Sequence, residues 1–156
     1  MTWTVQIRRA LPGDAEAISA LILELAHYFT CQPDGEGAER FLEGLGPQAI
    51  RAYIGDPGLH YLVATEARRL LGVAAMRDGR HLFHLFVAPA GHRQGIARQL
   101  WDMLSQAAIA AGNRQGFTVN STPYAVPVYE RFGFQACGPR VEKNGIAYVP
   151  MQAPPG

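Results

Sequence analysis

The sequence contains few cysteines and no long apolar run. Its two cysteines, Cys31 and Cys137, are too few and too far apart for a disulfide framework or a cysteine metal site. No stretch approaches the roughly 18 apolar residues that a membrane-spanning helix needs. The first ten residues lack the basic-then-apolar order of a signal peptide. We therefore expect a protein of the reducing cytoplasm that has no membrane partner.

Charge is also scarce, and it is balanced in sign. Fourteen basic and 13 acidic residues give a net charge near zero. No basic run with interleaved aromatic residues indicates a nucleic-acid partner. The five histidines form no HExxH-type pair, so we expect no metal site. His81 and His84 stand three residues apart, a spacing that sends the two side chains to opposite faces of a regular strand.

Hydrophobic residues, by contrast, are abundant. They make up 48% of the 156 residues, which is enough to bury the core of one domain covering residues 1–156. Sequence repeats are absent, and no linker suggests a second domain. We expect a single folded unit.

The most informative stretch runs from His84 to Leu104. Residues 82–88 are almost wholly apolar, which is typical of an interior strand, and a Pro/Gly turn ends this strand. From Ile96 the apolar residues recur at helical spacing. Gly95 therefore lies at a junction between a strand and a helix.

A junction of this kind suits an anionic ligand. The first N–H groups of a helix have no partner within it, and the helix dipole is positive there, so a phosphate binds readily. Gly95 lets the backbone approach such a ligand closely, and His92, Arg93 and Arg98 add cationic or hydrogen-bonding side chains. The pattern is neither a Walker A motif nor a dinucleotide GxGxxG motif. Taken alone, it also fits an ordinary strand-to-helix turn.

Two sequence blocks together resemble the GNAT superfamily of N-acetyltransferases. They are HLFVAPAGHRQGIARQLW and VNSTPYAVPVYERFGF. The first is similar to the family signature Q/R-x-x-G-x-G/A, which cradles the pyrophosphate of coenzyme A. Here it reads His92-Arg93-Gln94-Gly95-Ile96-Ala97, with His92 where Gln or Arg is usual. Which of His92 and Arg93 contacts the pyrophosphate is left open.

The resemblance covers about residues 3–151 and implies an α/β GNAT fold. Its mixed, mostly antiparallel sheet would have about seven strands and four helices in the order β-α-α-β-β-β-α-β-α-β-β. Periodicity and turn residues agree with this order, and Gly44, Gly46 and Pro47 should break or kink the second helix. The expected strands are residues 3–9, 59–65, 70–77, 82–88, 117–120, 134–137 and 146–151, and the expected helices are 15–28, 38–53, 96–111 and 125–132.

The second block suggests an acid for catalysis. Residues 125–134 are similar to the A-x-x-x-Y-x-x-x-G-F block, whose tyrosine is the proposed acid for the coenzyme A thiolate. A phenol with a pKa near 10 can donate a hydrogen bond and a proton to a developing thiolate. Tyr129 would hold this role. Without the resemblance, packing on an apolar helix face explains Tyr129 better.

The resemblance also implies where the pantetheine arm of the donor binds. The backbone of Leu85, Phe86 and Val87 would contact it, and Asn120 would end the strand at the point where a GNAT sheet splays apart. The Asn120 amide could bond the arm or simply belong to an Asn-Ser-Thr-Pro turn. The implied cofactor-binding residues are Leu85, Phe86, Val87, His92, Arg93, Gln94, Gly95, Ile96, Ala97, Arg98 and Asn120.

The general base is less clearly marked. In several family members a carboxylate on the fourth strand serves, directly or through water, and here the comparable residue is His81. An imidazole with a pKa near 6.5 is a workable base at neutral pH. His84 is the alternative candidate for this role. A bulge in this strand, which family members often carry, would change the face of the sheet to which its side chain points. Either histidine could also be purely structural.

The acceptor is marked only weakly. Glu24, Asp34, Glu36 and Glu39 would give the acceptor side a negative rim that attracts a cationic amine, although a solvated acidic loop explains them too. His27, Tyr28 and Phe29 could contact an acceptor or pack a helix end.

We therefore expect an acetyl-CoA-dependent N-acetyltransferase. It would move an acetyl group to a primary amine of a small molecule or peptide, by direct transfer in a ternary complex. Alternatives are a non-catalytic acyl-CoA sensor and an unrelated nucleotide-binding α/β domain. The oligomeric state stays open, a homodimer being one option.

Overall fold

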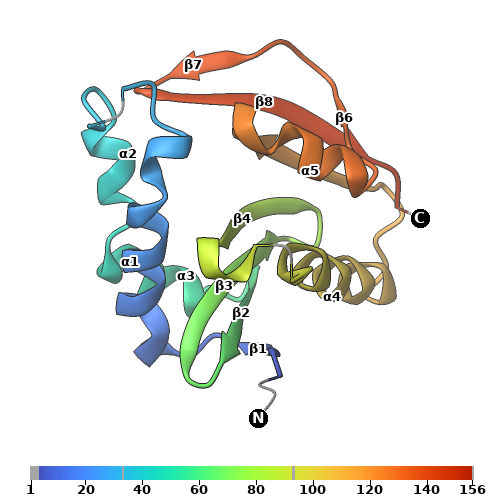
Figure 1. The fold of residues 1–156 in the computed structure, drawn as a ribbon. Coiled ribbons are helices and arrows are strands. Elements are labelled where there is room, and N and C mark those ends of the chain that lie inside the picture. The colour runs from blue at the N-terminus through green and yellow to red at the C-terminus, as the bar shows by residue number, and fades with distance from the viewer. Residues whose placement is uncertain (1–3, 33, 93, 156) are drawn as a thin grey trace.

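One eight-stranded sheet with helices on both faces makes up this computed structural model, which describes residues 4–32, 34–92 and 94–155 (Figure 1). The strands are β1 (Gln6–Arg9), β2 (Leu59–Glu66), β3 (Arg69–Arg77), β4 (His81–Val87), β5 (Phe117–Ser121), β6 (Gln135–Ala136), β7 (Val141–Lys143) and β8 (Ile146–Ala153). The helices are α1 (Ala15–Glu24), α2 (Glu39–Glu43), α3 (Pro47–Ile54), α4 (Ile96–Ala110) and α5 (Val126–Arg131), and short 3₁₀ turns are η1 (Pro12–Asp14), η2 (Ala26–Tyr28), η3 (Pro89–Gly91) and η4 (Pro123–Ala125).

The strand order is β1-β2-β3-β4-β5-β8-β6, with β7 paired to β8. Every pairing is antiparallel except β4 with β5, so the predicted mixed, mostly antiparallel sheet is confirmed. The predicted break in the second helix is also confirmed, and it raises the helices from four to five. An eighth strand, β7, was not predicted. β1 begins at Gln6, and Trp3, at which its strand was predicted to start, lies outside the described residues.

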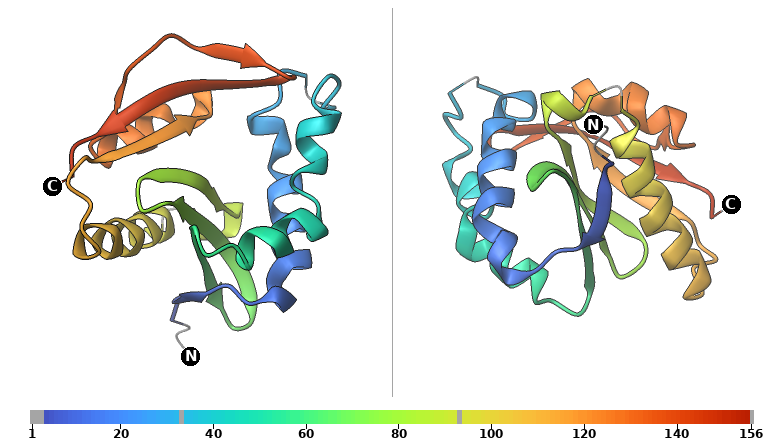
Figure 2. Two further views of the ribbon diagram at one scale, coloured as in Figure 1. Left: turned by 180° about the vertical axis from the view of Figure 1, so that it is seen from behind. Right: turned by 60° about the horizontal axis from the view of Figure 1, so that its bottom comes forward.

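Helices cover the two faces of the sheet unequally. The α1 and α3 helices pack on one face, and α4 packs on the other (Figure 2). Each face of the sheet carries its own hydrophobic core, and successive side chains of β2 and β3 point alternately into the two. Leu62 and Ala74 pack in the core on the α4 side, whereas Val63 and Val73 pack in the core under α1 and α3. This explains why both strands have nearly continuous apolar sequences.

The hairpin turns between β2, β3 and β4 lie between the strands predicted for residues 59–65, 70–77 and 82–88. Ala67 and Arg68 have φ of +51° and +68°, and Asp78 and Gly79 have φ of +53° and +65°. Positive φ at both central residues matches the right-handed twist of the flanking strands. These turns fix β4 against β3.

β4 and β5 separate soon after they meet. Their parallel pairing has only two partners, His81 with Thr118 and Leu82 with Val119. Beyond Leu82 the edge of β4 that faces β5 is left unpaired, while β3 still holds its other edge. The predicted splay of the sheet at Asn120 therefore coincides with the end of this pairing.

A β-bulge in β4 changes which side chains share a face. Ala75 pairs with His84 and Met76 pairs with Leu82, so Phe83 is the extra residue. Phe83 and His84 consequently both lie toward α1 and α3, with their rings stacked at 4.1 Å. His81, opposite Arg77, lies on this same face, because the Arg77 guanidinium covers the Phe83 ring. The expectation that His81 and His84 lie on opposite faces is wrong, since it assumed a regular strand.

The β7–β8 hairpin reaches back to the segment that follows α1. The Cys31 N–H donates to the Gly145 carbonyl at 2.8 Å, and the Ala147 N–H donates to the Phe29 carbonyl at 3.1 Å. Gly145 has φ of +76°, and a Cβ at this position would collide with the backbone of Gly37 and Ala38. The hairpin tip therefore holds the loop between α1 and α2 against the C-terminal strands.

Replacing Gly145 with alanine tests this contact. We expect Gly145→Ala to cost about 2 kcal/mol of unfolding free energy, or about 4–8 °C in Tm, because the side chain meets backbone atoms and φ is positive. Gly13→Ala is the matched control, since an added Cβ there meets nothing within 4 Å. Thermal unfolding by circular dichroism measures both, and equal Tm values for the two variants would contradict the account.

Candidate active site

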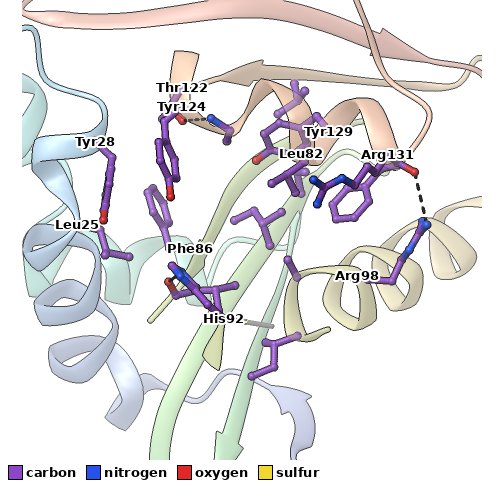
Figure 3. A pocket seen from close by; sticks show the side chains of 18 of the residues that line it. Leu25, Tyr28, Leu82, Phe86, His92, Arg98, Thr122, Tyr124, Tyr129 and Arg131 are labelled. Atoms are coloured by element: carbon purple, nitrogen blue, oxygen red, sulfur yellow. Dashed lines mark hydrogen bonds between the residues drawn. The ribbon is translucent and has the colours of Figure 1, made fainter. Parts of the chain in front are cut away.

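A cavity of about 520 Å³ opens where β4 and β5 separate (Figure 3). Residues from both faces of the sheet line it. Leu82, Leu85 and Tyr129 belong to the core on the α4 side, whereas Phe83 and Phe86 belong to the α1 side. The cavity therefore passes through the sheet, which lets two ligands meet from opposite faces.

One end of the cavity lies at the start of α4. Gly95 precedes the helix with φ of +73°, a left-handed conformation that strains other residues. The first amides of α4, at Ile96, Ala97 and Arg98, have no acceptor within the helix, and all three residues line the cavity. Gly91 packs so closely that an added Cβ would lie 2.9 Å from Ile96 Cδ1. This turn fits an anion such as a diphosphate.

Basic side chains surround this end. Arg98 donates from Nη2 to the Arg131 carbonyl at 3.4 Å, and its guanidinium lies 5.1 Å from the centre of the Phe132 ring. His92 and Arg131 also line the cavity (Figure 3). The Nε2 of His92 lies 3.1 Å from the Val87 carbonyl, so an Nε2–H tautomer would donate to it. Sequence reasoning missed Arg131, whose signal was its place two residues after Tyr129, in the last turn of α5.

The backbone of β4 offers hydrogen-bonding groups to the cavity. The Ala88 N–H donates to the Leu71 carbonyl of β3 at 2.7 Å. In an antiparallel pair every second residue directs its N–H and C=O to the neighbouring strand, so the backbone groups of Phe86 also point to β3. Leu85 and Val87 therefore direct their N–H and C=O groups away from β3, toward the splay. Of the three residues expected to give backbone contacts, Leu85 and Val87 are positioned for it, and Phe86 instead lines the cavity with its side chain.

Tyr129 lies between the two ends of the cavity. It projects from α5, and its ring packs edge-on against Phe132 and Phe134. Burial raises the pKa of Tyr129, so the phenol stays protonated at neutral pH. Every fully buried side-chain polar atom in the described residues has a hydrogen-bond partner, whereas the Tyr129 hydroxyl has none there. The hydroxyl is therefore open to the cavity (Figure 3).

Asn120 lines the cavity, and its neighbours make the turn that follows β5. Ser121 Oγ donates to the Thr122 carbonyl at 2.7 Å, and Thr122 Oγ1 accepts from the Ala125 N–H at 3.1 Å. Thr122 therefore caps the segment that leads into α5, and Pro127 lies in the first turn of that helix, where a proline is tolerated. The Asn120 side chain is not used by this turn, which leaves it free to bind a ligand.

The other end of the cavity is aromatic. Tyr28, from η2, and Tyr124, from η4, face each other with ring centres 4.7 Å apart (Figure 3). Phe29 and Phe86 pack behind them with ring centres 5.9 Å apart. Sequence reasoning named Tyr28 and Phe29 as options but missed Tyr124, which follows Pro123 directly after the splayed strand.

A comparison with protein-family models decides the family. The model of the acetyltransferase (GNAT) domain matches residues 30–154. The chain belongs to the GNAT family of acetyltransferases. The suspected resemblance and the predicted fold class are thereby confirmed, and the chain is an enzyme of the N-acetyltransferase type.

Solved structures share this fold. A GCN5-related N-acetyltransferase from Rhodopseudomonas palustris matches with a TM-score of 0.79 and 23% identity, covering 99% of this chain and 98% of that one. The PaiA N-acetyltransferase of Thermoplasma acidophilum, in complex with coenzyme A, matches with a TM-score of 0.77 and 14% identity over 97% and 99% of the two chains. No curated protein sequence gives a significant match. None of the helices in residues 4–32, 34–92 and 94–155 has the length and apolarity needed to span a membrane.

Most of the predicted site residues of this GNAT acetyltransferase line the cavity. Gln94 does not, because its side-chain Nε2 donates to the Ala90 carbonyl at 2.8 Å. Arg93 lies outside the described residues. His81 also lies outside the cavity lining. The predicted residues that line the cavity are Leu85, Phe86, Val87, His92, Gly95, Ile96, Ala97, Arg98, Asn120 and Tyr129.

The two candidate bases of the acetyltransferase lie behind the cavity. His81 Nδ1 lies 2.8 Å from Thr118 Oγ1 at the closed end of the splay. His84 is buried, and its Nδ1 lies 2.9 Å from the Tyr61 hydroxyl. Burial, with a contribution from nearby Arg77, lowers the pKa of His84 to about 3 and lowers that of His81 as well. His84 is therefore neutral and serves the packing of Phe83 and Phe86.

Acid should unfold the protein partly through His84. The unfolded imidazole, with an ordinary pKa of 6.5, binds a proton as pH falls below that value, whereas the folded one does not until about 3. The unfolding free energy therefore decreases as the pH falls from about 6.5 to about 3. From about pH 7 to about pH 5, this group alone should remove roughly 2 kcal/mol of unfolding free energy.

Urea unfolding of wild type and His84→Gln at both pH values measures this loss. The variant should be less stable at pH 7 but lose roughly 2 kcal/mol less on acidification, since the amide does not titrate. His27→Gln, at an exposed histidine, should keep the wild-type pH dependence. An unchanged pH dependence in His84→Gln would show that the imidazole is not held neutral.

Proposed function

We propose that this chain transfers the acetyl group of acetyl-CoA directly to the primary amine of an acceptor bound on the opposite side of the same cavity. The main support is the passage through the sheet, which has a phosphate-binding turn at one end and the Tyr129 phenol midway. A ternary complex needs both substrates to reach one point from separate directions, and such a passage allows this.

The donor would bind along the α4 side of the splay. Its diphosphate fits the turn at Gly95, where backbone amides and the basic side chains of Arg98 and Arg131 favour negative charge. The outward N–H and C=O groups of Leu85 and Val87 would pair with the amides of the pantetheine arm, much as an added strand pairs with a sheet edge. The neighbour PaiA was solved with coenzyme A, which is consistent with this fit.

Acetyl-CoA would supply an activated acyl thioester. The acceptor ammonium must first lose a proton, and its nitrogen lone pair then forms a bond to the acetyl carbonyl carbon. The carbon–sulfur bond breaks, the second amine proton leaves, and the sulfur takes up a proton. The net products are the acetamide, free coenzyme A thiol and one proton.

Tyr129 would donate to the departing sulfur. The raised pKa of the phenol keeps it protonated, so it is ready as a hydrogen-bond donor. The same raised pKa makes full proton transfer costly in the ground state. We therefore assign its main effect to the hydrogen bond that strengthens as negative charge develops on sulfur.

The identity of the general base remains a prediction. His81 is the comparable residue of the family, yet its Nδ1 faces Thr118 and its side chain does not line the cavity. A role for His81 would need a relay through water. Proton loss to solvent before the amine enters the cavity is the simpler alternative.

The turn at Gly95 gives a test of donor binding. Gly95→Ala should raise the Kd for coenzyme A by about tenfold, because a left-handed conformation is unfavourable for alanine and the amides of the cradle shift when the turn relaxes. Isothermal titration with coenzyme A measures this. Gly112→Ala is the control, since Gly112 also has positive φ, at +111°, but lies outside the cavity lining. A similar Kd in both variants would place the diphosphate elsewhere.

Replacing Tyr129 with phenylalanine separates the enzyme from the alternative of a non-catalytic sensor. We expect Tyr129→Phe to lower kcat by about 10²-fold, with the Kd for coenzyme A within about twofold of wild type, because the lost hydroxyl acts on the developing thiolate. Release of free thiol from acetyl-CoA measures kcat. Tyr148→Phe, in the part of β8 that pairs with β7, is the control. An unchanged kcat in Tyr129→Phe would remove the phenol from the mechanism.

A further inference from the structure

The acceptor end of the cavity contains aromatic and aliphatic side chains where a charged amine would need a counter-ion. Phe29 and Phe86 form its floor, Leu25 adds an aliphatic edge, and Tyr28 and Tyr124 form its mouth. Tyr28 and Tyr124 are 36% and 65% exposed, although both are large and apolar in most of their surface. Exposed aromatic faces of this kind beside a cavity indicate a ligand surface.

No acidic side chain lines this cavity among the described residues. The four acidic residues that suggested a cationic acceptor, Glu24, Asp34, Glu36 and Glu39, lie outside the cavity lining, and two of them bond backbone N–H groups nearby in the chain. Asp34 Oδ1 accepts from the Glu36 N–H at 2.9 Å, and Glu39 Oε1 accepts from the Gly37 N–H at 3.2 Å. The charged residues that do line the cavity are Arg98 and Arg131, both at the donor end. A polycation would therefore meet positive charge and no counter-charge.

We propose that the acceptor is a monoamine carried on an apolar, preferably aromatic, body that packs against the exposed faces of the Tyr28–Tyr124 pair and rests on Phe86. This inference rests on the proposed acetyl transfer and names the substrate class of the same site. The two tyrosines come from separate elements, one after α1 and the other before α5, and their rings contact each other with centres 4.7 Å apart, so together they present one aromatic surface at the mouth of the cavity. Aromatic pairs of this kind contribute binding energy beyond the area that they bury.

The apolar surroundings also help the chemistry. Transfer of an ammonium group from water into a cavity without a counter-charge lowers its pKa and favours the neutral amine. The aromatic faces can still attract the ammonium at the mouth before it loses its proton. The acceptor end thereby prepares a nucleophilic nitrogen without a strong base beside it, which agrees with the position of His81 outside the cavity.

A matched amine panel tests the proposal. We expect kcat/KM for 2-phenylethylamine to exceed that for hexylamine, and to exceed that for spermidine by tenfold or more. Tyr124→Ala should lower kcat/KM for 2-phenylethylamine by about tenfold, mainly through KM, because the more exposed ring of the Tyr28–Tyr124 pair is lost. Tyr124→Phe should restore most of it, since the ring and not the hydroxyl makes the contact. Ile109→Ala, an exposed apolar residue of α4 outside the cavity lining, is the control and should keep the wild-type profile.

Binding of the amines to protein saturated with coenzyme A separates this proposal from the proposed activity. If no amine releases thiol but 2-phenylethylamine still binds more tightly than spermidine, and Tyr124→Ala loses that binding, acetyl transfer fails and the aromatic acceptor surface stands. A preference for spermidine, or a Tyr124→Ala variant with the wild-type profile, overturns the aromatic acceptor surface even if thiol is released. Coenzyme A binding in each variant reports that it is folded.

Discussion

The loss of pairing between β4 and β5 after two residue pairs is the constraint on which the remaining structure depends. A sheet that stayed closed would bury the outward backbone groups of Leu85 and Val87 in a ladder and would leave no passage. Because β3 continues to hold β4 along its other edge, the strand stays rigid while one of its edges is open. Rigid backbone whose hydrogen-bonding groups face a cavity is what a ligand with amide groups requires.

The bulge at Phe83 decides what each side of the passage is made of. It places Phe83 and His84 on one face and returns Leu85 to the other, so that Phe86 faces α1 while Val87 faces α4. A regular strand would exchange these faces beyond Leu82. The separation of an aromatic end of the cavity from a polar end is therefore a consequence of one extra residue. His84 supports it as a neutral ring bonded to Tyr61.

The fold and the turn at Gly95 could be predicted from the sequence because their signals are local. Gly95 between a strand and a helix, the apolar period of α4, and the turns at Ala67–Arg68 and Asp78–Gly79 depend on neighbouring residues only. The face of the sheet on which His81 and His84 lie could not be predicted, because it depends on the bulge in β4. A bulge is a property of two paired strands and has no signal in one of them alone. Tyr124 and Arg131 were missed for a similar reason: their place in the site depends on how far β5 departs from β4, and sequence spacing does not encode this.

The bond between the Ala147 N–H and the Phe29 carbonyl has a consequence for how the molecule is built. It joins residues 118 positions apart, across the wall that carries Tyr28 and Phe29. The wall that carries Tyr28 and Phe29 is therefore complete only after β8 has been synthesised. Contacts between residues so far apart along the chain are slow to form.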